Sequence, residues 1–508
     1  MSPLSHQPTL ACETCKSRKR KCDKALPKCS LCASKGLSCR YPAVERRTHH
    51  EPQYPSPQSS SSSIVSPRNP AATPSAPPPN NFPPVFYLDW KIFQGCQVEI
   101  PKPILPLPPN ISTLIGNAET WEGIATEYFS TTHTWMPIIS KKNLYEHIRN
   151  PLGQIRLDYA LLLLAMDLIC WVPDRDDPRT PTYLAAKSFY LDLEIQGFVS
   201  LQILQAEILI ALFELGHAVY PSATVSIEAC VRYGCALGIN WDAKFPVKRP
   251  FNWVDGDEHN RVWWAVVILD RISRIGFPCR ELLTEDPTPE TILPSDDKAW
   301  DEGVMPPKCF KVLHQDNPKK LGQFALKAEA TRLLGQVIRH VEAPSFGGSF
   351  HAEEGRLLDG ALRALVTVTQ FEGQNHSLDV MNQTAMCSIA LILLHEAHAS
   401  SNSGTSEYFE RIHRTKHLTT LVQNSAEEMT TGGEAPIRSC VKAASPFITI
   451  FLYQIATANL RRSRDQKVDG PYEDFVVIKA ALRVFDERWR ASGAYLKILE
   501  AREVLSAC

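Results

Sequence analysis

Six cysteines near the start of the chain have the spacing of metal ligands. The pattern is C-x2-C-x6-C-x6-C-x2-C-x6-C, formed by Cys12, Cys15, Cys22, Cys29, Cys32 and Cys39. A Cys-x2-Cys step lets two thiolates face one metal ion from a tight turn. The stretch is also a repeat of seventeen residues, in which the first, second and third cysteines map onto the fourth, fifth and sixth.

The number of ligands limits how metal can be held. Two tetrahedral zinc ions need eight ligand bonds, but the stretch offers six thiolates and no histidine between Cys12 and Cys39. Six thiolates can supply eight ligand bonds if two of the sulfurs each bind both ions. The alternative is a disulfide knot or a metal-free loop, and a secreted knot would need an export signal. Residues 1–10 lack an apolar core, so we predict two Zn²⁺ per chain in a six-cysteine cluster.

The two halves of the repeat differ in charge. The six residues after Cys15 are K-S-R-K-R-K, with five basic side chains, whereas the six after Cys32 are A-S-K-G-L-S, with one. Residues 1–50 carry a net charge of +8, and the whole chain is −1, which leaves −9 for the other 458 residues. A basic first half on an acidic body predicts contact with a polyanion, namely DNA. The basic run also has the composition of a nuclear import signal.

The stretch closely resembles the fungal zinc binuclear-cluster family of DNA-binding modules. It shares the six cysteines at the family spacing, the basic run, Lys21-Cys22-Asp23, and Pro27 before the fourth cysteine. The resemblance implies that Cys12 and Cys29 are the bridging thiolates. One zinc ion would then add Cys15 and Cys22, and the other would add Cys32 and Cys39.

The resemblance also implies roles for the basic run. In the family, a short helix after the second cysteine enters the major groove with its C-terminal end towards a CGG triplet. The base-reading lysine of the family falls on Lys19, and guanine offers the acceptor pair O6 and N7 there. Lys16, Arg20 and Lys21 are then expected to contact phosphates, which position the module without reading sequence. We expect Arg18 to contact the backbone as well.

Composition divides the chain into four parts. We predict a disordered N-terminus (1–11), the cluster domain (12–40), a Pro/Ser-rich linker (41–111) and a large all-α regulatory domain (112–508). The linker contains a five-serine run and Pro77-Pro78-Pro79, a composition that cannot bury enough apolar surface to fold. No coiled-coil heptad is visible between residues 40 and 84. The apolar stretch 85–93 is either a strand or arm that docks on the following domain, or an activation or partner-binding segment.

Apolar residues at helical spacing predict the helices of the large domain. We expect a helix to start at Asp255 with Glu258 as a capping box and to end at Gly276. The other expected helices span 117–133, 155–171, 201–219, 224–237, 318–342, 352–372, 377–399, 405–430, 438–462 and 474–505. The longest apolar runs are broken by charges, so no membrane span is expected. The nine cysteines outside the cluster are expected to be reduced, buried thiols.

The large domain resembles the fungal-specific transcription factor domain over roughly residues 120–300. The resemblance is carried by Trp135-Met136-Pro137-Ile138, by the run from Glu258 to Trp264, and by Leu269-Asp270-Arg271. We expect Trp263 and Trp264 to pack in a core. Glu258, Arg261 and Asp270 are expected to form a buried structural network.

Two other functions deserve comparison with DNA binding. Asp174-Arg175-Asp176-Asp177 could suggest a magnesium site of a terpene-cyclase type, but such a site needs helical aspartates and a second motif. Pro173, Pro178 and Pro181 place this run in a loop. We therefore expect no enzyme activity and no catalytic or cofactor-binding residues. The helical domain could instead act as a small-molecule sensor, although no motif in the sequence marks a pocket.

Together these features predict a nuclear, sequence-specific regulator of RNA polymerase II transcription in a fungus. The expected partners are double-stranded DNA with CGG-type half-sites and the transcription machinery or co-regulators. A homodimer through the helical domain is a further expectation, and no membrane partner is expected. The pattern is typical of pathway-specific or cluster-specific regulators, but it does not name the target genes.

Overall fold

The computed structural model forms two compact units, residues 1–77 and 78–508. The structure describes residues 12–18, 20–25, 27–40, 84–89, 91–92, 106–150, 155–174, 177–241, 247, 249–275, 277, 280–288, 290–305, 321–342, 349–372, 377–401, 441–466 and 470–507.

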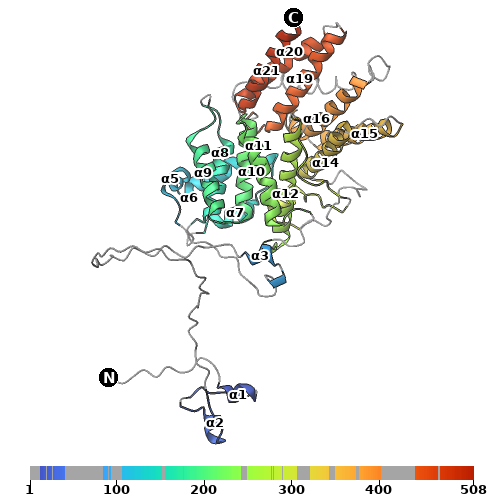
Figure 1. Cartoon of the computed structure of the whole chain (residues 1–508). Helices are drawn as coiled ribbons and strands as arrows, with labels where there is room; N and C mark the ends of the chain where they lie inside the picture. Colours follow the sequence, from blue (N-terminus) through green and yellow to red (C-terminus); the bar gives the residue numbers. More distant parts are fainter. Residues whose placement is uncertain are drawn as a thin grey trace, which may run out of the picture. The chain divides into compact units, whose positions relative to one another are not determined.

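The first unit contains two helices of a single turn, α1 (Glu13–Ser17) and α2 (Ser30–Ser34) (Figure 1). Cys12 is the N-cap residue of α1, and Cys29 is the N-cap residue of α2. Helices this short are not stable alone in water, because nucleation costs more than one or two hydrogen bonds return. The side chains between the two helices must therefore hold this unit together.

The second unit is an assembly of helices, and its described residues contain no β-strand. This confirms the predicted all-α class. The helices are α3 (Val85–Leu88), α5 (Pro109–Ile115), α6 (Ala118–Ser130), η1 (Thr132–Thr134), α7 (Lys141–Ile148), α8 (Leu157–Cys170), α9 (Pro181–Ile195), α10 (Leu201–Gly216), α11 (Ser222–Leu237), α12 (Trp253–Arg274), α13 (Asp297–Glu302), α14 (Gln323–Glu342), α15 (Ser349–Glu372), α16 (Ser377–Ser401), α19 (Pro446–Gln466), α20 (Gly470–Asp486) and α21 (Arg490–Ala507).

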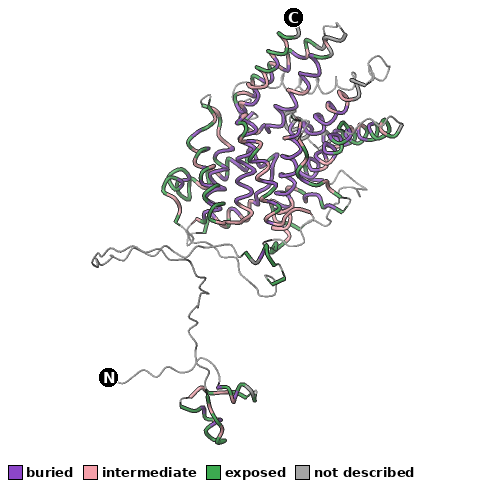
Figure 2. Tube along the Cα trace, viewed as in Figure 1, coloured by how far each residue is buried: buried purple, intermediate pink, exposed green. Residues whose placement is uncertain are grey.

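Helix α10 lies at the centre of this unit. Every residue of α10 from Ile203 to Gly216 is buried, and the helix packs against α8, α11 and α12 (Figure 2). A helix that is apolar on all sides needs neighbours all round. Its sequence of sixteen residues with few charges therefore explains its central place.

The C-terminal helices extend the same core. Helix α14 packs against α16, α16 against α19, α19 against α20, and α20 against α21. They join the first helices at α10, which contacts α19 and α21. At Gly216, the last residue of α10, a Cβ would collide with the ring of Trp489. The close approach of α10 to this tryptophan therefore requires glycine.

The helix boundaries correct several predictions. Helix α12 begins at Trp253, and its N-cap is Asn252, whose side chain accepts a hydrogen bond from the Asp255 N–H. The predicted capping box at Asp255 and Glu258 is therefore wrong. The predicted helix 474–505 is two helices, α20 and α21. Helices α7 and α9 were not predicted, and the predicted helix 405–430 lies outside the described residues.

The described part of the apolar segment before the body includes one helical turn, α3. The Phe86 side chain is buried, and the Tyr87 hydroxyl donates a hydrogen bond to the Ala236 carbonyl of α11 at 3.1 Å. The segment thus docks on the following domain, as one of the two expectations had it, but as a helix and not as a strand. Residues 41–83 of the predicted linker lie outside the described residues, and α5 already begins at Pro109.

Within the described residues, no helix is both long enough and apolar enough to cross a bilayer.

Candidate metal centre and DNA-binding surface

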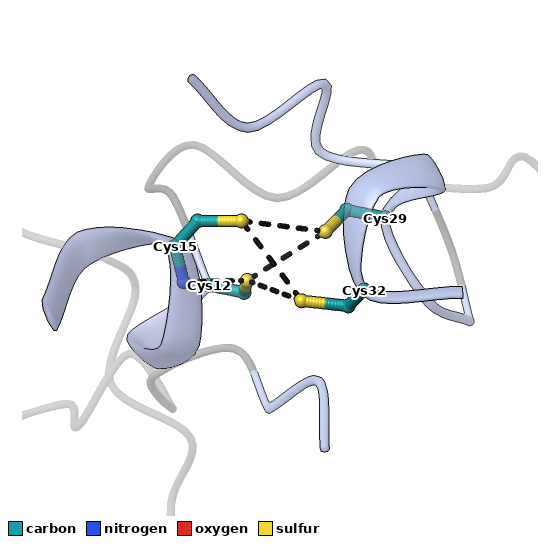
Figure 3. Close-up of side chains that lie close together, drawn as sticks. All are labelled: Cys12, Cys15, Cys29 and Cys32. Atoms are coloured by element: carbon teal, nitrogen blue, oxygen red, sulfur yellow. Dashed lines mark hydrogen bonds between the residues drawn. The ribbon is translucent and has the colours of Figure 1, made fainter. Parts of the chain in front are cut away.

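Four of the six predicted zinc ligands meet between α1 and α2. The sulfurs of Cys12 and Cys15 face those of Cys29 and Cys32 (Figure 3), and all four residues are buried. The Sγ–Sγ distances are 3.7 Å from Cys12 to Cys29, 3.7 Å from Cys12 to Cys32, 3.6 Å from Cys15 to Cys29 and 3.9 Å from Cys15 to Cys32. These four thiols form the small core of the unit.

The spacing of these sulfurs fits zinc. A tetrahedron with Zn–S bonds of about 2.3 Å has edges of about 3.8 Å between its sulfurs. Three of the observed separations join sulfurs that the resemblance assigns to a common ion, at 3.7 Å for Cys12–Cys29, 3.7 Å for Cys12–Cys32 and 3.6 Å for Cys15–Cys29. Cys15 and Cys32, which it assigns to different ions, lie 3.9 Å apart. Thiolate donors are also the soft ligands that select zinc in structural sites. The residues present are therefore suited to hold zinc, which would supply the cross-link that this unit otherwise lacks.

The other two cysteines lie beside the central pair Cys12 and Cys29. The Cys29 N–H donates to the Cys39 Sγ at 3.3 Å. The corresponding bond of the first half runs from the Cys12 N–H to the Cys22 sulfur, and it lowers the pKa of the Cys22 thiol. The Cys22 sulfur also lies within 4.8 Å of the Cys29 sulfur. Both outer thiols thus approach the two cysteines that the resemblance assigns as bridges.

The seventeen-residue repeat is visible in the backbone. The Arg20 N–H donates to the Cys15 carbonyl at 2.9 Å, and the Leu37 N–H donates to the Cys32 carbonyl at 2.9 Å. Each residue of the first bond maps onto its counterpart in the second by adding seventeen. The two halves therefore have the same backbone structure around the same ligands.

Asp23 has a structural role that sequence reasoning missed. Its carboxylate accepts hydrogen bonds from the Ser30 N–H at 3.1 and 3.2 Å, at the start of α2. In the other half, the Glu13 N–H at the start of α1 donates to the Arg40 carbonyl at 2.9 Å. The repeat pairs Glu13 with Ser30 and Asp23 with Arg40. The register of the repeat was therefore the signal that could have found this contact.

Crowding of the thiols perturbs their protonation. Burial acts to raise the pKa of Cys12, but hydrogen bonds from the Cys15 N–H and from neighbouring thiols outweigh it and lower this pKa to about 6. Burial and the hydrogen bond to Cys12 raise the pKa of Cys15 to about 12. One thiolate is thus favoured at the expense of its neighbour. A divalent cation would remove this conflict, because it replaces protons on all the sulfurs.

The basic side chains lie on the surface of the first half. Lys16, Arg18, Arg20 and Lys21 are exposed, and Arg18 is the C-cap residue of α1. Lys19, the predicted base reader, lies outside the described residues. The helix after the second cysteine that the resemblance implies corresponds to the end of α1. The exposed positive charge of the unit is therefore concentrated next to α1.

In the body, the predicted core residues are buried. Trp263 and Trp264 lie in the apolar core, and the Trp264 Nε1–H donates to the Ile292 carbonyl at 3.1 Å. Asp174 and Asp177 lie between α8 and α9, outside both helices, while residues 175 and 176 lie outside the described residues. The described part of the aspartate run is thus in a loop, as predicted.

Glu258, Arg261 and Asp270 are buried but belong to separate networks. Glu258 accepts hydrogen bonds from the Ser140 N–H at 2.9 Å and from the Gln205 side chain at 2.8 Å. The other two residues bond elsewhere: Arg261 pairs with Asp257 and Asp297, and Asp270 accepts from the Thr284 N–H and pairs with Arg271. Each network fastens a loop to α12, which is a structural role.

Two protein families match the chain. The Fungal Zn(2)-Cys(6) binuclear cluster domain matches residues 10–48, and the Fungal specific transcription factor domain matches residues 125–345. The second match extends beyond the stretch in which the sequence motifs were recognised.

The curated relatives are fungal transcription factors. Transcription factor BOA15 of Botryotinia fuckeliana (strain B05.10) is 45% identical over 181 residues, which are 35% of this chain and 98% of the relative. Citrinin biosynthesis transcriptional activator mrl3 of Monascus ruber is 23% identical over 299 residues, 52% of this chain and 58% of the relative. Sorbicillinoid biosynthetic cluster transcription factor sor4 of Hypocrea jecorina (strain QM6a) is 43% identical over 47 residues, 9% of this chain and 7% of the relative.

These matches agree with the cysteine core, the basic surface and the helical body. Zinc binding by the cysteine cluster and DNA binding by the same domain follow from the family, and the families and relatives are regulators, not enzymes. The chain therefore belongs to the fungal Zn(2)-Cys(6) transcription factors with a fungal-specific transcription factor domain.

Proposed function

We propose that the chain is a nuclear regulator of RNA polymerase II transcription that reads CGG-type triplets through a two-zinc cluster. Cys12 and Cys29 would bridge the two ions, Cys15 and Cys22 would complete the ligands of one ion, and Cys32 and Cys39 would complete those of the other. The supporting observation is that both outer thiols, Cys22 and Cys39, lie against the Cys12 and Cys29 pair. A shared central pair is what six sulfurs need to give two ions four ligands each.

One observation carries the proposal for DNA recognition. The two halves share the backbone hydrogen bonds that follow each Cys-x2-Cys step, yet five basic residues follow Cys15 and one follows Cys32. Equal scaffolds with unequal charge indicate that only the first half faces phosphates. We assign Lys19 to guanine, and the exposed Lys16, Arg18, Arg20 and Lys21 to the DNA backbone.

The target genes are proposed to form a biosynthetic gene cluster. Support comes from the relatives, two of which carry the names of the citrinin and sorbicillinoid pathways. Deletion of the gene in its host, followed by transcript profiling, tests this. We expect the transcripts of one contiguous gene set to change together. A change spread over unlinked genes of primary metabolism would contradict a cluster-specific role.

We further propose that two chains associate through the helical body, so that each pair of clusters meets two half-sites. The cluster unit has only a small cysteine core, whereas the body is a large folded unit. In such dimers, the geometry of the protein sets the spacing between the two DNA half-sites. Sedimentation of the full chain should give a dimer, and fragment 1–80 should sediment as a monomer. A stable dimer of the fragment would overturn this assignment.

A further inference from the structure

A cavity of about 220 Å³ lies at the start of α14 in the helical body. Its walls include Trp135, Pro137 and Phe324, which are buried and apolar, and its rim includes Thr134 and Gln323, which are exposed. An engineered protein cavity of about 150 Å³ is large enough to bind benzene. The cavity in this body is therefore large enough for a molecule of about one ring.

The cavity also contains a buried cation. Lys327 lines it with only 3% of its surface exposed, and its ammonium donates a hydrogen bond to the Trp135 carbonyl at 2.5 Å. The Nζ lies 5.7 Å from the centroid of the Trp135 ring and 5.9 Å from that of Phe447. Among the described residues, no carboxylate forms an ion pair with Lys327.

A buried ammonium with this environment is incompletely satisfied. It carries three donors, and the Trp135 carbonyl takes one of them. Burial of an unpaired charge is costly, and burial lowers the pKa of Lys327 to about 7, with Asp297 opposing the change. A negatively charged group in the cavity would supply the missing partner.

Another part of the lining joins further helices. Asn382 of α16 lines the cavity, and its amide donates to the Ala443 carbonyl at 3.3 Å and accepts from the Ser445 N–H at 2.8 Å. Ser445 immediately precedes α19. A molecule in the cavity would thus contact the loop after η1, α14, and the junction between α16 and α19.

We propose that this cavity binds a small organic acid. The carboxylate would pair with the Lys327 ammonium, and an apolar body of about one ring would lie against Trp135 and Phe324. Such a site goes beyond DNA recognition, because it makes the helical body a receptor for an acidic metabolite. Because the ligand would bridge several helices, its binding would stabilise the body.

Calorimetric titration of the full chain with benzoate tests the proposal, with benzamide as the uncharged counterpart. We expect benzoate to bind and to raise the melting temperature of the body. Hydrogen bonds to charged groups are strong enough for a preference of about ten-fold or more over benzamide. Hexanoate and hexanamide form a second pair, for an aliphatic ligand. Failure of both acids to bind at millimolar concentration would overturn the proposal, as would equal binding of acid and amide.

Three variants locate the site. Lys327→Met removes the charge and keeps the length of the side chain, and we expect it to lose acid binding by about ten-fold or more. Gln323→Trp fills the rim from an exposed position, and we expect the same loss without disturbing a buried group. Lys479→Met is the matched control, because Lys479 is a largely buried lysine near an aromatic ring on α20. Unchanged acid binding in a folded Gln323→Trp protein would place the ligand elsewhere and contradict the proposal.

Discussion

The cluster unit and the helical body are held together by different chemistry. In the cluster unit, two five-residue helices meet over four buried cysteines. In the body, a continuous apolar core runs from Ile111 to Leu499. A metal ion can stabilise a unit too small to bury enough apolar surface, whereas the body needs none. We therefore expect that either unit can be unfolded while the other stays folded.

The largest expected effect is loss of the cluster by Cys29→Ser. Because Cys29 is assigned to both ions, we expect both zinc ions to be lost, as measured by elemental analysis. Zinc binding in small structural sites is worth about 10–16 kcal/mol, so residues 12–40 should unfold and specific DNA binding should vanish. The melting temperature of the body should stay unchanged. Cys235→Ser is the control and should keep the full zinc content. Cys235 of α11 is exposed, so the expectation of a buried thiol is wrong at this position.

The reverse test is Trp264→Ala in the body. Trp264 is fully buried, and truncation of a buried Phe or Trp costs about 3–5 kcal/mol. We expect denaturant unfolding of the body to show this loss. Zinc content and DNA contacts of the cluster unit should persist under conditions in which the variant body is folded. Loss of zinc from this variant would show that the two units depend on each other.

Within the cluster unit, two lysines test the division between base reading and positioning. Lys19→Ala should cost about 1–3 kcal/mol on a CGG site and much less on scrambled DNA. Lys21→Ala should weaken binding to both DNAs similarly and reduce the salt slope by about one unit. Fluorescence anisotropy titrations at several salt concentrations measure both effects. Equal weakening of both DNAs by Lys19→Ala would remove Lys19 from its role as base reader.

The smallest effect, taken over a single pH unit, is a change in the unfolding free energy of the body with pH. Burial, with a contribution from Glu214, raises the pKa of Glu207 from 4.5 to about 8, although Lys187 opposes the change. Between these values the folded state keeps a proton that the unfolded state has released. Stability should therefore fall as pH rises through this window, by at most about 1.4 kcal/mol per pH unit. Glu207→Gln should flatten the slope of unfolding free energy against pH, and an unchanged slope would contradict this.

The helices of the body were predictable where local pattern and tertiary contact agree. The expected helices 201–219 and 224–237 correspond to α10 and α11. Their apolar side chains recur along the sequence at helical spacing, so the local pattern was sufficient. The start of α12 was not predictable from the sequence. Glu258 fits a capping box locally, but its side chain bonds to Ser140 and Gln205, which are distant in sequence. Helix α9 was missed although Thr180 and Pro181 mark its start. Proline at the first helical position is favoured, so this signal was available.

The break between α20 and α21 could not be read from the sequence. No proline or glycine interrupts residues 487–489, but Arg488 is buried and donates to the carbonyls of Ile169 and Trp171 at 2.6 and 3.0 Å. These two carbonyls lie at the C-terminal end of α8, more than three hundred residues before Arg488 in the sequence. The cysteine pattern was easier to interpret, because thiol spacing within one short stretch specifies the site without such long-range contacts.

The most direct test of the account is selection of binding sites from random DNA by the zinc-loaded full chain. The account predicts enrichment of CGG triplets, with no such enrichment for Cys29→Ser and with a relaxed triplet for Lys19→Ala. Enrichment of a motif without CGG, or the same enriched motif from the Cys29→Ser protein, would contradict recognition through the zinc cluster.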